Sequence, residues 1–152
     1  PGIARYLSVA WVRDDEYWQD PAGRHSMQLN YDLVQLGVRI ERILILDDFF
    51  WPPAAVLPAK TICQWIDDQH KRGIVVRLVR ESEIEAERDL LCDFGIYGER
   101  ATGCLEMDDC RTVRFTLDFD PRSVHLFEER WRRLLLFAAS YRELRSRIAT
   151  GR

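Results

Sequence analysis

The sequence lacks the features that assign a chain to a membrane, to a secretory route or to a zinc-binding class. No apolar run reaches the roughly 18–20 residues of a bilayer-spanning helix, and no basic-then-apolar signal pattern opens the chain. The four cysteines, at positions 63, 92, 104 and 110, form no C-x-x-C pair and have no nearby pair of histidines. We therefore expect a cytoplasmic chain with reduced thiols, no membrane insertion, no metal and no other cofactor.

Lysine is also scarce, and neither sign of charge dominates. Only Lys60 and Lys71 are lysines among 22 basic residues, and the arginines are interspersed with 25 acidic residues, for a formal net charge of −3. Nucleic-acid binding depends on concentrated positive charge, so we expect no nucleic-acid partner. The length of 152 residues suits one domain. Because the chain begins at Pro1 rather than Met, we expect residues 1–152 to be a single domain from a longer protein.

Hydrophobic patterning predicts alternating strands and helices. Segments rich in β-branched and aromatic residues are predicted as strands at 5–12, 38–46, 74–79, 94–97, 101–107 and 111–119, the last two joined by a turn at Asp108-Asp109. Helices are predicted from Ser26 to Gly37, from the prolines of the 52–58 loop to Gly73, over the short polar segment 82–91, and from Asp120-Pro121 onward. This order predicts an α/β fold whose mixed sheet is parallel in its first half and antiparallel in its second, with helices on both faces.

Polar and aromatic residues gather where two of the predicted parallel strands end. Asp47, Asp48 and Trp51 follow one strand, and Arg80 follows the next. Ligands of open α/β sheets bind beyond the carboxyl ends of the strands, so these four residues are candidate ligand-binding residues. The alternative is a loop whose aromatic side chains only seal the end of the sheet.

The last predicted helix carries Phe127 and Trp131 at helical spacing among charged residues. A position in the core is the simplest interpretation of Trp131. If the helix presented both residues outward instead, they would form the interface of a dimer, because protein interfaces are enriched in aromatic residues.

Two segments on either side of a predicted helix, LGVRIERILIL at 36–46 and KRGIVVRLV at 71–79, resemble one half of the phospholipase D superfamily. The later run DFGIY at 93–97, followed by a hairpin and the helix segment FEERW at 127–131, is similar to non-catalytic domains of that superfamily that are attached to regulators and membrane-remodelling proteins. The resemblance covers about residues 31–141. It implies a phospholipase D-like half, and therefore a homodimer that pairs two halves across a two-fold axis.

The catalytic motif of the active members, His-x-Lys-x4-Asp, is missing. None of the three histidines, at positions 25, 70 and 125, begins it, and alanine with glycine, or threonine with cysteine, occupies the expected positions in the strand at 101–107. The resemblance therefore implies a catalytically inactive, ligand-sensing or protein-interaction module of a larger regulatory protein, whose partner is a protein or a small molecule. The alternative is a hydrolase of another mechanism that uses Asp47, Asp48 and Arg80 at the carboxyl edge of the sheet.

Overall fold

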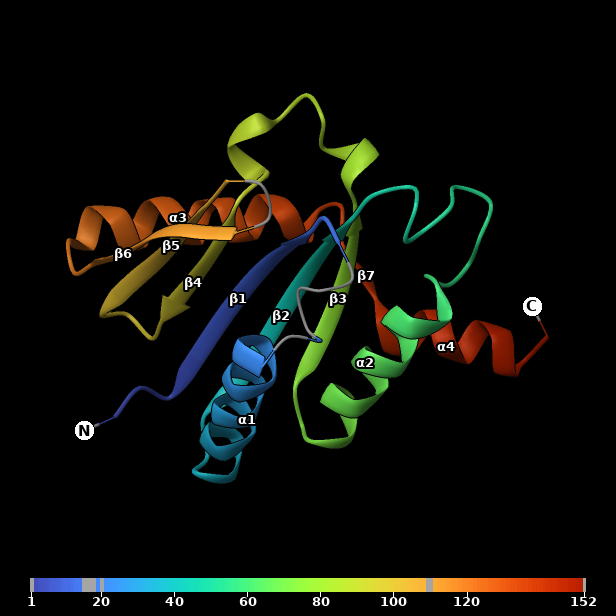
Figure 1. The fold of residues 1–152 in the computed structure, drawn as a ribbon, viewed down its shortest axis with the longest axis horizontal. Coiled ribbons are helices and arrows are strands. Elements are labelled where there is room, and N and C mark those ends of the chain that lie inside the picture. The colour runs from blue at the N-terminus through green and yellow to red at the C-terminus, as the bar shows by residue number, and fades with distance from the viewer. Residues whose placement is uncertain (1, 15–18, 20, 109–110, 152) are drawn as a thin grey trace.

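The computed structural model describes residues 2–14, 19, 21–108 and 111–151, and these form one seven-stranded mixed sheet (Figure 1). The strands are β1 (Arg5–Val12), β2 (Arg39–Leu46), β3 (Val75–Arg80), β4 (Asp93–Tyr97), β5 (Ala101–Asp108), β6 (Arg111–Asp118) and β7 (Ala139–Ser140). Their order across the sheet is β6-β5-β4-β1-β2-β3-β7. Strands β1, β2 and β3 are parallel, and the other neighbouring pairs are antiparallel. The predicted mixed α/β fold is confirmed.

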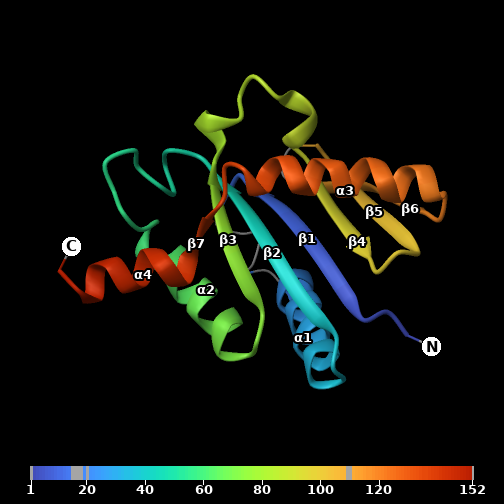
Figure 2. The ribbon, with the colours of Figure 1, turned by 180° about the vertical axis from the view of Figure 1, so that it is seen from behind.

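Helices cover both faces of this sheet. They are α1 (Pro21–Gln35), α2 (Lys60–Lys71), α3 (Pro121–Leu135) and α4 (Tyr141–Ala149). Helices α1 and α2 each connect two neighbouring parallel strands by a crossover, so both lie on the same face. Helix α3 covers the opposite face, as Figure 2 shows from behind. No helix of the described residues is long and apolar enough to cross a bilayer.

Two hydrophobic cores result, one on each face of the sheet. Successive residues of a strand point to opposite faces, so the apolar run at the end of β2 serves both cores. Leu44 packs with α2 and α4, whereas Ile43 and Ile45 pack with α3. This two-sided burial explains why β2 has no alternation of apolar and polar residues over these positions.

Phe127 and Trp131 do not point outward, which is the condition under which they would form a dimer interface on α3. Trp131 is only 6% exposed and belongs to the core between α3 and the sheet. The Phe127 ring packs against the Phe94 ring of β4, with 5.0 Å between ring centroids. The apolar side of an amphipathic helix turns toward the sheet that it covers, so neither residue forms an exposed face on α3.

Three local features differ from the prediction. Residues 82–91 form two short 3₁₀ turns, η2 (Glu81–Glu83) and η3 (Arg88–Leu90), in place of a helix. Helix α1 begins at Pro21 rather than Ser26, because proline is well tolerated in the first turn. Strand β7 and helix α4 were not predicted at all. The predicted turn at Asp108-Asp109 lies partly outside the described residues.

Candidate functional site

Arg80, at the end of β3, fastens the loop that follows β2. Its Nη1 donates hydrogen bonds to the carbonyl oxygens of Trp51 (2.7 Å) and Pro52 (3.0 Å), and its Nη2 donates to that of Ala55 (2.9 Å). The guanidinium lies over the Trp51 ring, 3.7 Å from its centroid, and the indole Nε1 donates to Ala55 as well. Trp51 and Arg80 thus lie together, but their polar groups hydrogen-bond to the loop itself. This arrangement agrees with the alternative interpretation, in which the loop only seals the end of the sheet.

The two aspartates of this loop do not join them. Asp47 accepts a hydrogen bond from the backbone N–H of Phe50 (3.1 Å), which shapes the turn, and the Asp48 side chain is exposed. Neither carboxylate forms an ion pair with Arg80. A ligand-binding role of Asp47 and Asp48 therefore stays a prediction.

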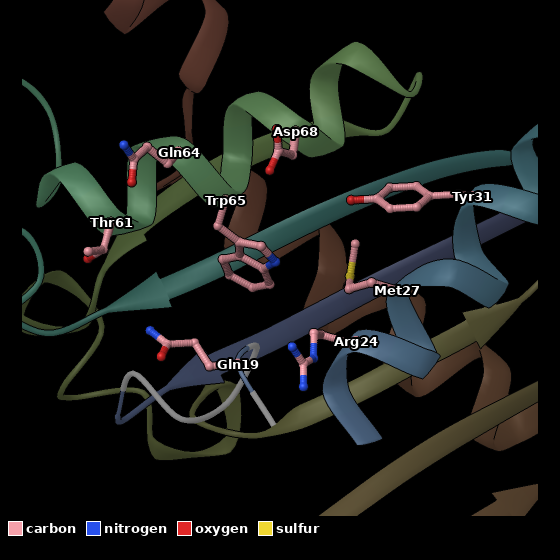
Figure 3. A pocket seen from close by; sticks show the side chains of 8 residues that line it. All are labelled: Gln19, Arg24, Met27, Tyr31, Thr61, Gln64, Trp65 and Asp68. Atoms are coloured by element: carbon pink, nitrogen blue, oxygen red, sulfur yellow. The ribbon is translucent and has the colours of Figure 1, made fainter. Parts of the chain in front are cut away.

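A cleft of about 530 Å³ lies between α1 and α2 (Figure 3). Its volume is typical of pockets for small molecules, which are about 300–1,000 Å³. Met27 and Tyr31 project into it from α1, and Trp65 and Asp68 from α2. The remaining lining residues are Gln19, Arg24, Thr61 and Gln64.

Arg42 of β2 is buried beside this cleft. It is 5% exposed and points to the face that α1 and α2 cover. Its Nε donates to Ser8 Oγ (3.2 Å), and its Nη1 lies 2.6 Å from Gln69 Oε1 and 3.2 Å from Met27 Sδ. Within the described part of the chain these neutral groups are its only hydrogen-bond partners, and no carboxylate lies within ion-pair distance. Met27 lines the cleft and contacts the Arg42 guanidinium, whereas Arg42 itself is not one of the lining residues, so Arg42 lies behind the Met27 side of the wall.

Donors exceed acceptors around Arg42. A guanidinium has five N–H donors and no acceptor, and its Nη2 makes no hydrogen bond to any described residue. The side-chain Nε2 of Gln69, a fully buried residue, has no hydrogen-bond partner either. A buried charge without a counter-ion is unfavourable by several kcal/mol. Among the described residues, no acceptor with negative charge contacts this network, and Gln69 Nε2, unlike Arg42 Nη2, is fully buried without a partner.

Other charged side chains lie in the cleft wall or beside it. Arg24 lines the cleft, Arg72 lies over the Tyr31 ring at 4.4 Å, and Asp68 is the one acidic group among the described lining residues. Burial raises the pKa of Tyr31, the positive charges of Arg72 and Arg42 lower it, and the Asp68 carboxylate raises it. The charge of Arg42 therefore acts on a residue of the cleft wall.

A second buried charge, Asp93 of β4, has partners instead. Its carboxylate accepts the backbone N–H of Trp11 (2.8 Å) and pairs with Arg13 (3.3 Å). Burial raises the pKa of Asp93, although both partners oppose this shift. Asp93 thus has a charged partner that offsets part of the unfavourable burial, whereas Arg42 has no charged partner among the described residues.

The thiols and other potential metal ligands of the described residues form no second candidate site. Cys63, Cys92 and Cys104 are free, as predicted, whereas Cys110 lies outside the described residues. Burial raises the pKa of Cys92 to about 11, so its thiol is a poor nucleophile at neutral pH. In the described residues no group of three or more His, Cys, Asp or Glu side chains is placed to hold a metal ion.

Sequence reasoning missed the cleft and Arg42. A signal was present, since Arg42 lies inside the run VRIERILIL that was predicted as a buried strand, and arginine is almost never fully buried unless it is paired. Comparison with known proteins gives no information about this site, because no family model, curated protein or solved structure matches this chain. The resemblance to the phospholipase D superfamily stays a prediction.

Proposed function

We propose that this chain is a non-catalytic binding module that senses a small anionic molecule in the cleft between α1 and α2. The observation that carries the proposal is Arg42, a buried cation beside the cleft whose partners in the described residues are all neutral. This is the ligand-sensing role expected from the sequence, moved from the loop at Asp47 to the helix-covered face.

A bound carboxylate or phosphate would supply the missing acceptor. Guanidinium binds both groups through charge-assisted hydrogen bonds, each contributing about 1.5–3 kcal/mol. The Nη2 of Arg42 has no partner among the described residues, and Arg24 in the cleft wall offers a second guanidinium. The same contacts would relieve the unfavourable burial of an unpaired charge, so binding and stability are coupled.

The remaining walls indicate what the anion is attached to. Tyr31 and Trp65 face the cleft from opposite helices, and both side chains are half-buried (Figure 3). Two aromatic walls favour a flat or apolar group, which would stack or pack between them. We therefore propose a ligand class with one carboxylate or phosphate on a planar or apolar body.

The hydrolase alternative has less support. It requires Arg80 to act beside Asp47 and Asp48, yet both Nη groups of Arg80 donate to loop carbonyls. A hydrolase also needs a nucleophile or activated water next to a base, and the geometry of this loop provides no such pair among the described residues.

Titration with benzoate and phenyl phosphate tests the proposed function. We expect either anion to shift the backbone NMR resonances of Met27, Tyr31 and Trp65, whereas benzamide, which has the same shape without the charge, leaves them in place. The Arg42→Met variant should bind at least tenfold more weakly, by about 1.4 kcal/mol or more. Arg39→Met changes an exposed arginine of the same strand and should bind as the wild type does. The proposal would be contradicted if neither anion shifted these resonances, or if the Arg42→Met variant bound the anions as tightly as the wild type does.

A further inference from the structure

Strand β6 is one edge of the sheet and carries an exposed apolar stripe. Val113, Phe115, Leu117 and Phe119, which follows the strand, are 47–67% exposed. We call these four residues the β6 stripe. Their spacing of two places their side chains on one face. An exposed edge with an apolar face is a template for pairing with another strand.

The β6 stripe lies on the face that α3 leaves open. Asp118 accepts a hydrogen bond from the Ser123 hydroxyl at the start of α3, so even-numbered residues of β6 point to the α3 side and the stripe points away. On the open side the Phe115 ring packs over Gly103, where a Cβ atom would lie 2.8 Å from it. Helices α1 and α2 cover β1 to β3 on this side and leave β6 uncovered (Figure 1).

We propose that β6 pairs antiparallel with β6 of a second copy of this chain, with the two-fold axis at Thr116. The inference goes beyond the ligand cleft and does not depend on it. In this register Arg114 lies opposite the partner's Asp118 and Asp118 opposite the partner's Arg114, so two ion pairs form on the α3 side. Opposite charges placed directly across a strand pair stabilise it by roughly 0.2–1 kcal/mol each.

Two neighbouring registers lack this complementarity: an axis at Arg114 places two like charges opposite each other, and an axis at Phe115 places Arg114 opposite Thr116. An axis at Leu117 places Arg114 opposite the partner's Asp120, but Asp120 lies beyond the end of β6 and already caps α3. The Thr116 register also pairs the β6 stripe with itself, because Val113 then lies opposite the partner's Phe119 and Phe115 opposite the partner's Leu117. Both kinds of contact are self-complementary, which a two-fold interface requires.

The edge also lacks two of the usual devices against pairing. Natural edge strands are commonly blocked by proline or lysine, and residues 112–118 contain neither. The β5–β6 ladder is irregular where Glu106 pairs with Arg114 and Met107 pairs with Thr112, so Val113 is an extra residue of β6 at the end of the segment proposed to pair. An edge without proline or lysine, whose charges are complementary to the same strand run in reverse, favours a second copy as the occupant.

Sedimentation equilibrium of Arg114→Glu tests the proposed pairing. This variant places a carboxylate opposite the partner's Asp118, so the dimer dissociation constant should rise at least tenfold relative to the wild type. Arg132→Glu makes the same charge change at another exposed arginine, on α3, and should leave the constant unchanged. A wild type that stays monomeric at 100 µM overturns the proposal, as does a dimer that both variants leave equally intact. Retained benzoate shifts in the Arg114→Glu variant would separate this result from the cleft.

A cross-link tests the register directly. Only residue 116 lies opposite itself in the proposed pairing, so Thr116→Cys should give a covalent dimer when oxidised glutathione is added. Val113→Cys places its thiol opposite the partner's Phe119 and should cross-link no more than the wild type, which also controls for the native cysteines. Equal cross-linking of the two variants, or none by Thr116→Cys, overturns the register. A circular dichroism spectrum like that of the wild type shows that each variant is folded.

Discussion

Replacement of Arg42 by methionine gives the sharpest energetic test of the buried cation. Arg42→Met removes a charge that has only neutral partners in the described residues and keeps a side chain of similar length. It also leaves Gln69, a fully buried residue, without the donor to its Oε1. Arg42→Met/Gln69→Met removes both polar groups, so the pair of variants separates the cost of the charge from the cost of the orphaned amide.

The expected magnitudes follow from this geometry. Loss of the hydrogen bond leaves the Gln69 side-chain carbonyl buried without a donor, which lowers the free energy of unfolding by about 1–3 kcal/mol. Removal of the buried charge raises it by a similar amount. The single variant should therefore lie within about 1–2 kcal/mol of the wild type. The double variant should be more stable than the wild type by about 1–4 kcal/mol, the range seen when apolar residues replace buried ionic groups.

Urea denaturation followed by circular dichroism measures these free energies of unfolding. Saturating anion adds a second readout, since a ligand at 100 times its dissociation constant should stabilise the wild type by about 2.7 kcal/mol and the Arg42→Met variant hardly at all. Arg39→Met is the control for loss of one positive charge on the same strand. A double variant that is less stable than the wild type by about 3–5 kcal/mol would refute the reasoning, because that is the cost of breaking a compensated buried ion pair.

Two further predictions concern the loop at Trp51 and the charge at Asp93. Arg80→Lys should lower the free energy of unfolding, measured by urea denaturation, by about 2–3 kcal/mol. One ammonium group cannot replace the three hydrogen bonds to carbonyl oxygens and the stacking on Trp51. The control Arg88→Lys, at an exposed position, should change the free energy of unfolding by less than about 0.5 kcal/mol. Burial raises the pKa of Asp93 above its usual 3.8, so its contribution to stability is complete below that pH and declines as pH rises through the raised pKa. Asp93→Asn should accordingly gain stability relative to the wild type between acid and neutral pH. A shift in the opposite direction would mean that the ion pair with Arg13 outweighs burial.

The fold was largely predictable because strand and helix patterns are local. The apolar run of β2 and the cap at Asp120, which accepts the N–H of Arg122, are properties of neighbouring residues. The segment 82–91 does not form a helix because its fully buried residues Ile84 and Leu90 are six positions apart, a spacing that does not place them on one helical face. Helix α4 was missed although Ser140 and Glu143 have the spacing of a capping box, and the Ser140 side chain accepts the Glu143 N–H.

The candidate site was much less predictable, because it depends on contacts between distant segments. Arg42 meets Ser8, Met27 and Gln69 only after two crossovers have placed α1 and α2 on one face of the sheet. The predicted residues Trp51 and Arg80 did come together, yet the same proximity lets the backbone carbonyls of the loop use the Arg80 donors. Sequence position shows which groups can meet, but not which of their hydrogen bonds the chain itself already satisfies.

We propose that Arg42 recognises an anion in the cleft between α1 and α2. A crystal structure of the wild type grown with 4-bromobenzoate tests it most directly, because the anomalous signal of bromine locates the ligand. We predict the bromine between Tyr31 and Trp65 and a carboxylate oxygen about 3 Å from Arg42 Nη2. A cleft without bromine, or a carboxylate that contacts Arg24 alone while Arg42 keeps only its neutral partners, would contradict the claim.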